Sequence, residues 1–154
     1  ETGLRVAELC GLLVDDLWYA DRPVKNLVVR KEIAKNKKER QIPISTKLSE
    51  TIEKMERTLW WPNNANSGSF AFFAGNPAIK LTTRTVERVI LAAGLAAFNQ
   101  EVTPHMLRHT FATRVMRKTN ARVVQALLGH TSLQSTQIYM HPNQDDLREA
   151  IDGG

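Results

Sequence analysis

The sequence predicts a mainly helical α+β fold, in which amphipathic helices stand beside a small antiparallel sheet. Apolar residues recur at helical spacing in most segments after residue 45. Three short segments between residues 15 and 45 are instead rich in β-branched and aromatic residues. A chain of 154 residues, 42% of them hydrophobic, is long enough for one domain with its own core.

The first element is a short helix expected over residues 3–12, with Thr2 as its N-cap and Gly11 as its end. The three short segments then predict one three-stranded antiparallel sheet. Pro43 marks the last strand as an edge, because proline cannot donate to a ladder, and Lys35 to Lys38 lie near the tip of the second hairpin. The expected strands cover residues 15–20, 25–31 and 40–45.

A series of helices follows the sheet. Residues 45–61 begin with a capping serine and place Leu48, Ile52, Met55 and Leu59 at spacings of three and four. Residues 62–69 form a loop, and the next helix is expected over residues 81–98, with Thr82 or Thr83 as its cap. Three more helices are expected over residues 121–130, where Gly129 ends the helix, 132–142 and 145–152.

The helix expected over residues 103–118 has the clearest start, with Thr103 at the N-cap and Pro104 at the first helical position. Apolar spacing predicts that its buried stripe contains Met106, Leu107, Thr110 or Phe111, and Val115.

The motif "HMLRH" at 105–109 has three interpretations. A metal site is disfavoured, because Met106 stands where a zinc peptidase has its glutamate and Arg108 would repel a dication. An anion site is favoured by His105 in the first turn, where backbone N–H groups and the helix dipole attract phosphate, and by the planar fork of Arg108. The third interpretation is a solvated helix with incidental His and Arg.

Charge points to a polyanionic partner. The chain carries 21 Lys and Arg against 16 Asp and Glu, and seven basic residues stand against two acidic ones between Lys25 and Arg40. Cys10 is the only cysteine, so no internal disulfide forms, and no run of apolar residues is long enough to span a membrane. We expect a cytoplasmic protein with no membrane association.

Five segments together resemble the catalytic domain of the tyrosine recombinases, the phage integrase family, over about nine-tenths of the chain. The family's ordered pattern of Arg, Lys, His-x-x-Arg, His or Trp, and Tyr is met in full, which is more specific than any single motif. The segments are "TGLRVAEL" (2–9), "AKNKKERQIPI" (34–44), "LTTRTVERV" (81–89), "TPHMLRHTFAT" (103–113) and "LLGHTSLQSTQIYMH" (127–141).

The resemblance implies that Arg5 and Arg108 clamp the scissile phosphate, while His105 and His130 assist phosphate binding and proton transfer. Two arginines with histidine donors gather positive charge around a phosphodiester without a metal. The resemblance therefore implies neither a metal nor any other cofactor.

It further implies that Tyr139 is the nucleophile, that Lys35 protonates the leaving 5′-hydroxyl, and that Glu8 supports the site. The family's hairpin commonly has glycine on both sides of the lysine, whereas this chain has Ala34 and Asn36, so Lys37 and Lys38 remain competitors for the role of Lys35. A further set of basic side chains is expected to bind the DNA backbone, namely Lys31, Lys37, Lys38, Arg40 and Arg84.

The implied partner is double-stranded DNA, cut and rejoined through a 3′-phosphotyrosine by four protomers on two duplexes, in a bacterial, archaeal or phage setting. The segment after Tyr139 is expected to dock on a neighbouring protomer. Because the chain has no initiator methionine, residues 1–154 are expected to be a fragment of the catalytic domain that lacks its first helices and an N-terminal core-binding domain, and that is monomeric alone.

Two alternatives remain. A type IB topoisomerase or telomere resolvase has a similar tyrosine site. A DNA-binding protein without catalysis could use the same scaffold.

Overall fold

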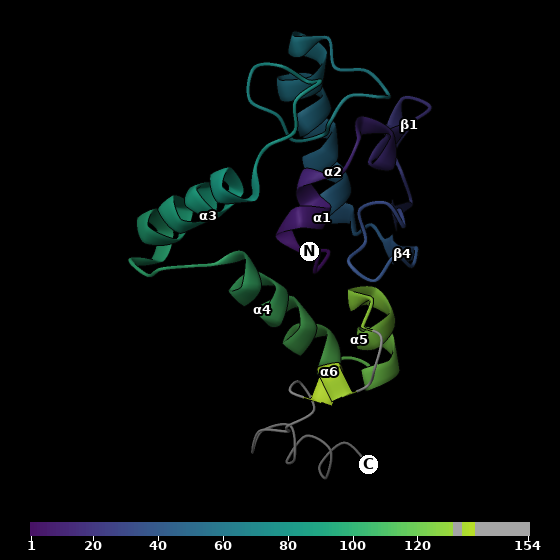
Figure 1. Ribbon diagram of the computed structural model, residues 1–154, viewed down its shortest axis with the longest axis vertical. Coiled ribbons are helices and arrows are strands. Elements are labelled where there is room, and N and C mark those ends of the chain that lie inside the picture. The colour runs from purple at the N-terminus through teal and green to yellow at the C-terminus, as the bar shows by residue number, and fades with distance from the viewer. Residues whose placement is uncertain (131–133, 138–154) are drawn as a thin grey trace.

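Helices dominate the computed structural model, which describes residues 1–130 and 134–137. Figure 1 shows α2 in the upper part of the molecule and α4 and α5 in its lower part. None of the helices in these described ranges combines the length and apolar character that crossing a bilayer requires. The α-helices are α1 (Val6–Cys10), α2 (Thr46–Met55), α3 (Thr83–Phe98), α4 (Pro104–Met116), α5 (Ala121–Leu128) and α6 (Gln134–Gln137). The strands are β1 (Trp18–Tyr19), β2 (Arg22–Pro23), β3 (Asn26–Val29) and β4 (Arg40–Pro43).

The α+β class is confirmed, but the single three-stranded sheet is wrong. Within the described residues, β1 pairs only with β2 and β3 only with β4, both antiparallel. Ala20 and Asp21 both have positive φ, so the chain reverses in two residues and Tyr19 faces Arg22 directly. The expected first strand therefore pairs with β2 in this tight hairpin instead of joining β3, and β3 pairs with β4.

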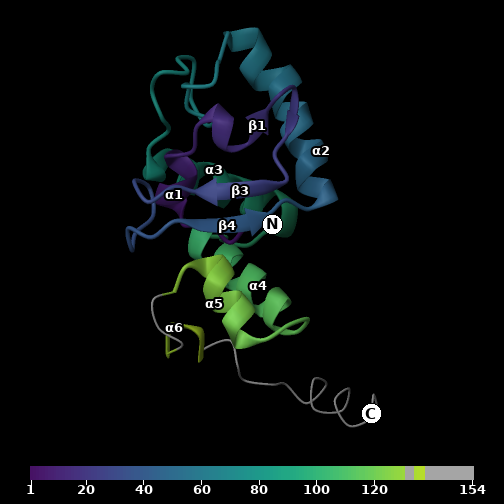
Figure 2. The ribbon, with the colours of Figure 1, turned by 90° about the vertical axis from the view of Figure 1, so that its right-hand side faces the viewer.

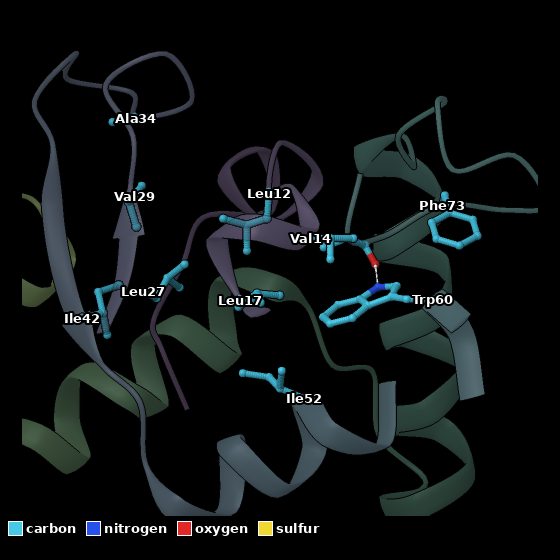
Figure 3. Packing of buried hydrophobic residues seen from close by; sticks show 11 residues of the cluster. Leu12, Val14, Leu17, Leu27, Val29, Ala34, Ile42, Ile52, Trp60 and Phe73 are labelled. Atoms are coloured by element: carbon cyan, nitrogen blue, oxygen red, sulfur yellow. Dashed lines mark hydrogen bonds between the residues drawn. The ribbon is translucent and has the colours of Figure 1, made fainter. Parts of the chain in front are cut away.

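The larger core lies between the β3–β4 hairpin, α2 and the loop that follows it (Figure 3). Ser45 caps α2 as expected by accepting a hydrogen bond from the Leu48 N–H. The helix continues through a π-helical segment, η2 (Glu56–Trp60), and a 3₁₀ turn, η3 (Trp61–Asn63). At its end Trp60 is buried, and its indole N–H donates to the Ala71 carbonyl over 3.0 Å.

A second, smaller core lies between α4 and α5. It consists of four buried residues: Phe111, Ala112, Val124 and Leu128. The helix α5 also contacts β4, which places it under the hairpin (Figure 2). The two helices that form this core therefore stand directly below the first one.

The start of α4 is confirmed, because the Met106 N–H donates to the Thr103 hydroxyl and Pro104 is the first helical residue. The expected buried stripe is wrong in its first turn. Met106 and Leu107 are 48% and 50% exposed, and the buried face begins with Arg108 and continues with Phe111. An arginine thus occupies a position that apolar periodicity assigns to a hydrophobic residue.

Helix α1 is shorter than the expected range of 3–12, and its N-cap is Arg5 rather than Thr2. Gly3 has a φ of +63°, which a right-handed helix cannot include. A Cβ at Gly3 would also lie 2.4 Å from Phe111 Cδ1. The glycine lets the chain pass closely over the α4–α5 core just before α1 begins.

Candidate active site

The first turn of α1 holds Arg5 and Glu8 together. The Glu8 carboxylate accepts hydrogen bonds from the Arg5 backbone N–H at 2.9 Å and from Arg5 Nη1 at 3.0 Å. The Arg5 side chain remains 27% exposed, while that of Glu8 is only 1% exposed. Glu8 therefore holds both the backbone N–H and the guanidinium of Arg5, while part of the Arg5 side chain stays accessible.

Arg40 approaches the same carboxylate from β4. Its Nη1 and Nη2 donate to the two Glu8 oxygens at 3.1 and 2.7 Å, and its Nε donates to the Leu127 carbonyl at 2.9 Å. Only 7% of the Arg40 side chain is exposed. The expectation that Arg40 binds the DNA backbone does not fit this geometry, because its guanidinium lies in the interior against Glu8 and α5.

Arg108 and His130 lie on the other side of the α5 end. Arg108 donates to the Gly3 carbonyl and, over 2.8 Å, to the Leu128 carbonyl. Its Nη2 is 3.3 Å from His130 Nε2, and His130 Nδ1 is 3.0 Å from the Thr136 hydroxyl. The fold thus brings Arg5, Arg108 and His130 into one cluster from three distant parts of the chain.

The electrostatics of the cluster favour an anion. Burial alone would raise the pKa of Glu8, but the hydrogen bonds and charges of Arg40 and Arg5 outweigh it and keep that pKa below its ordinary value. Burial lowers the pKa of His130, and the charges of Arg108, Arg5 and Arg40 lower it further. The cluster contains the guanidinium groups of Arg5, Arg40 and Arg108 but only the carboxylate of Glu8, which binds two of them, so positive charge is in excess beside His130.

The β3–β4 loop carries Lys35 beside this cluster. Ala34, on one side of it, is buried, and Asn36, on the other, donates from its side-chain amide to the Gly129 carbonyl over 3.2 Å. Lys37 has a positive φ at the turn, and Lys37 and Lys38 are exposed. Of the three lysines, Lys35 alone stands between two residues packed on the protein.

His105 lies apart from the buried cluster, exposed in the first turn of α4. It borders a surface hollow of about 580 Å³ whose lining also includes Arg84, Arg88 and Thr103. Arg84, expected at the DNA backbone, therefore lies on the same hollow as His105. The neighbouring carboxylates of Glu87 and Glu101 make this hollow less positive than the Arg5–Arg108 cluster.

The two remaining expectations concern Lys31 and Tyr139. Lys31 is exposed at the start of the β3–β4 loop, and Tyr139 and the segment after it lie outside the described residues. In the described part of the chain, no three His, Cys, Asp or Glu side chains gather closely enough to hold a metal ion.

Three polar residues of this region were not singled out from the sequence in the roles they have here. These are Asn36, which binds Gly129, Thr136, which contacts His130, and Arg40, which binds Glu8. The signal that could have found Asn36 is its departure from the glycine that the resembling family commonly has there. Nothing local in the sequence distinguishes Arg40 from the exposed lysines before it.

Comparison with known proteins identifies relatives of this chain. The model of the phage integrase family matches residues 1–146. A tyrosine recombinase of Pseudothermotoga lettingae is 35% identical over 97% of this chain and 49% of its own length. The tyrosine recombinase XerC of Pseudomonas fluorescens is 35% identical over 98% of this chain and 48% of its own length. The chain therefore spans about half the length of these relatives.

Solved structures show the same fold. The XerA recombinase is 34% identical, with a TM-score of 0.74 over 99% of this chain and 53% of its own. A XerH site-specific recombinase bound to difH substrate, in a pre-cleavage complex, has a TM-score of 0.73 at 24% identity, over 97% of this chain and 42% of its own. From the family match and the relatives, together with the clustered Arg5, Arg108 and His130, we conclude that this chain belongs to the phage integrase family.

Proposed function

We propose that this chain is the catalytic domain of a site-specific recombinase, which cleaves and rejoins double-stranded DNA through a covalent 3′-phosphotyrosine. The observation that carries the proposal is the convergence of Arg5, Arg108 and His130 at the end of α5. The positive charge of the two arginines suits the non-bridging oxygens of a phosphodiester, on which negative charge builds up during attack. The relatives named as tyrosine recombinases support this assignment.

In this proposal the two arginines clamp the scissile phosphate. Arg5 does so with its partly exposed side chain, and Arg108 with a guanidinium oriented by the Gly3 and Leu128 carbonyls. Fixed donors cost little reorganisation when the transition state forms. His130, held by Thr136, assists by donating a hydrogen bond to a phosphate oxygen or by transferring a proton, and His105 assists from the first turn of α4.

Tyr139 is the proposed nucleophile. A tyrosine hydroxyl has an ordinary pKa near 10, so its attack requires a neighbouring base or a positive field that stabilises the phenolate. The excess of positive charge around Arg5 and Arg108 supplies such a field. The Tyr139 ester then conserves the energy of the phosphodiester bond for rejoining.

Lys35 is the proposed general acid for the leaving 5′-hydroxyl. The packing of Ala34 and the Asn36–Gly129 hydrogen bond hold the backbone around Lys35 beside the His130 turn. Lys37 and Lys38, further along the turn, together with Lys31 and Arg84, are the proposed contacts to flanking phosphates. Binding through such contacts weakens steeply as salt rises, because counterions are released from DNA.

The direct test is a nicked suicide duplex incubated with the full-length protein. A covalent protein–DNA adduct should form, and it should vanish in Tyr139→Phe while DNA binding is retained. An adduct in the Phe variant would show that another residue is the nucleophile. DNA binding without any adduct in the wild type would favour a non-catalytic DNA-binding protein on the same scaffold.

Strand exchange distinguishes the recombinase from the relaxing topoisomerase and the telomere resolvase. Recombination joins strands of two duplexes, so two labelled sites should yield crossed products. We further propose that four protomers assemble on the two duplexes, with the segment after Tyr139 docking on a neighbour. Relaxation of supercoils with no crossed product would instead favour the topoisomerase.

A further inference from the structure

Three consecutive carbonyl groups at the end of α5 are each bound by a side chain from elsewhere. Leu127 accepts from Arg40 Nε at 2.9 Å, Leu128 from Arg108 Nη2 at 2.8 Å, and Gly129 from Asn36 Nδ2 at 3.2 Å. The last carbonyls of a helix have no partner inside it, and cations there meet the negative end of the helix dipole. These contacts fix the turn that leads into His130.

Arg40 is the donor among these that also reaches α1. Its two terminal nitrogens bind both oxygens of Glu8, which in turn holds the backbone and the guanidinium of Arg5. One continuous path therefore runs from Arg5 through Glu8 and Arg40 to the Leu127 carbonyl. Every link in it is a hydrogen bond to a charged group, the stronger kind.

Gly129 makes room for this path. With a φ of +64°, it adopts the left-handed conformation that ends α5. A Cβ at this position would lie 3.0 Å from Arg40 Cδ and 3.2 Å from its Nη1. The arginine thus lies closely against the glycine that directly precedes His130.

We propose that Arg40 is a positioning residue of the active site, which aligns Arg5 through Glu8 and the His130 turn through the Leu127 carbonyl so that both side chains meet one phosphate. This inference rests on the proposed strand-transfer function. Arg40 itself does not touch the DNA. Its planar fork serves two acceptors on different elements, a geometry that the single ammonium of lysine cannot reproduce.

Arg30 provides a matched control. It also lies at an end of the β3–β4 hairpin, donates to both oxygens of Asp16 at 2.9 to 3.1 Å, and donates to the Gly11 carbonyl at 3.0 Å. Its hydrogen-bond partners Asp16 and Gly11 lie on η1 (Val14–Asp16) and at the C-cap of α1, not in the first turn of α1 or at the end of α5. Arg30 and Arg40 thus form the same kind of network, one outside the site and one within it.

The experiment compares Arg40→Met, Arg40→Lys and Arg30→Met in the full-length protein. Single-turnover adduct formation on the nicked duplex is measured at saturating protein, with the DNA Kd and the Tm of each variant. A misalignment of about 1 Å lowers a rate about 100-fold, so we expect that loss in Arg40→Met and about a tenfold loss in Arg40→Lys. The DNA Kd should change less than about threefold in both, because Arg40 is buried and its guanidinium is bound by Glu8 and the Leu127 carbonyl. Arg30→Met should lower Tm but keep the rate within about threefold of wild type.

A second measurement is independent of cleavage. The pKa of His130 is followed by NMR titration, and it should rise in Arg40→Met, where a nearby positive charge is lost, and stay unchanged in Arg30→Met. If Arg40→Met does not fold, Arg40→Lys decides the matter through its rate. Equal rate losses in Arg30→Met and Arg40→Met at equal Tm, or a loss in Arg40→Met that lies wholly in the DNA Kd, would overturn the proposal.

Failure of the proposed strand-transfer function can be distinguished from failure of the positioning role of Arg40. If the wild type forms no adduct, the proposed function fails, while the His130 titration still reports whether Arg40 sets the environment of that turn. If the wild type forms the adduct and the Arg40 variants cleave at the wild-type rate, the positioning role alone fails.

Discussion

The two cores of this molecule are held in different ways. The larger one, around β3, β4 and α2, is mostly apolar, and its eleven buried residues include Leu12, Leu27, Ile52 and Trp60. The smaller one, between α4 and α5, has four buried apolar residues and is joined to the rest by Arg108, Arg40 and Asn36, which bind backbone carbonyls. Stability therefore comes chiefly from the larger core, whereas the geometry of the site depends on the polar contacts around the smaller one.

The largest loss of stability is expected from a substitution in the larger, apolar core. Trp60→Ala should lower the free energy of unfolding by about 3–5 kcal/mol, because it opens a cavity and leaves the Ala71 carbonyl without its indole donor. Urea denaturation measures this loss. The neighbouring Trp61 is 77% exposed, so Trp61→Ala should change stability by less than about 0.5 kcal/mol. Similar losses for both tryptophans would contradict the assignment of the main core.

A smaller loss is expected where the chain crosses the second core. Gly3→Ala should cost about 2–3 kcal/mol, since the new methyl group meets Phe111 and Leu128 and the positive φ is strained. Gly75→Ala separates the two causes, because Gly75 has a φ of +78° with no atom within 4 Å of an added Cβ. Thermal unfolding of both variants should show the greater loss for Gly3→Ala. Equal losses would mean that backbone strain alone matters at Gly3.

A still smaller change in stability is expected at the hydrogen bond between the β3–β4 loop and the end of α5. Asn36→Ala removes the hydrogen bond to the Gly129 carbonyl and should cost about 1 kcal/mol, while adduct formation slows because Lys35 is held less firmly. Asn63 donates a comparable hydrogen bond to the Leu59 carbonyl at 2.7 Å, but this bond is exposed and joins η3 to η2. Asn63→Ala should leave the cleavage rate unchanged. A matching loss of rate in that variant would argue against the idea that the Asn36–Gly129 hydrogen bond holds Lys35 in place.

The smallest effect is a dependence of stability on pH. Because the pKa of His130 is lowered in the fold by burial and then by Arg108, the unfolded chain takes up this proton first as pH falls. The contribution of His130 is complete above its ordinary pKa near 6.5 and is lost as pH falls through the lowered value. Glu8, whose pKa is also lowered, loses its contribution only below about pH 4.3, the ordinary value of a glutamate.

Urea denaturation between pH 7.5 and pH 5.5 should therefore show a decline in wild-type stability that is shallower in His130→Gln. An equal decline in both proteins would mean that His130 is not the group that titrates.

Local sequence signals predicted where most helices begin and end. The Thr103–Pro104 start of α4, the Ser45 cap of α2 and the Gly129 end of α5 are all confirmed. These features depend on hydrogen bonds and backbone angles within a few residues, so the local sequence is sufficient to specify them. The predicted start of α1 at Thr2 was wrong, because Gly3 has a positive φ where the chain passes closely over the distant Phe111 and Leu128.

Which face of a helix is buried was harder to predict. Met106 and Leu107 are apolar but about half exposed. Arg108 is buried because the Gly3 and Leu128 carbonyls accept hydrogen bonds from its guanidinium. Periodicity ranks residues by hydrophobicity and cannot identify an arginine whose partners are 105 and 20 positions away. The expected sheet failed for a related reason, since the choice of strand partner depended on the two-residue turn at Ala20 and Asp21.

The sequence by itself determined the fold class, the basic character of the hairpin and the residue types from which a phosphate site can be built. Their order along the chain was enough to indicate the family. Only the tertiary structure decided that Arg40 leaves the basic surface and turns inward to Glu8 and the end of α5. The physical reason is that a buried carboxylate needs a charged partner, and which of the hairpin's cations supplies it depends on how β4 packs on α1 and α5.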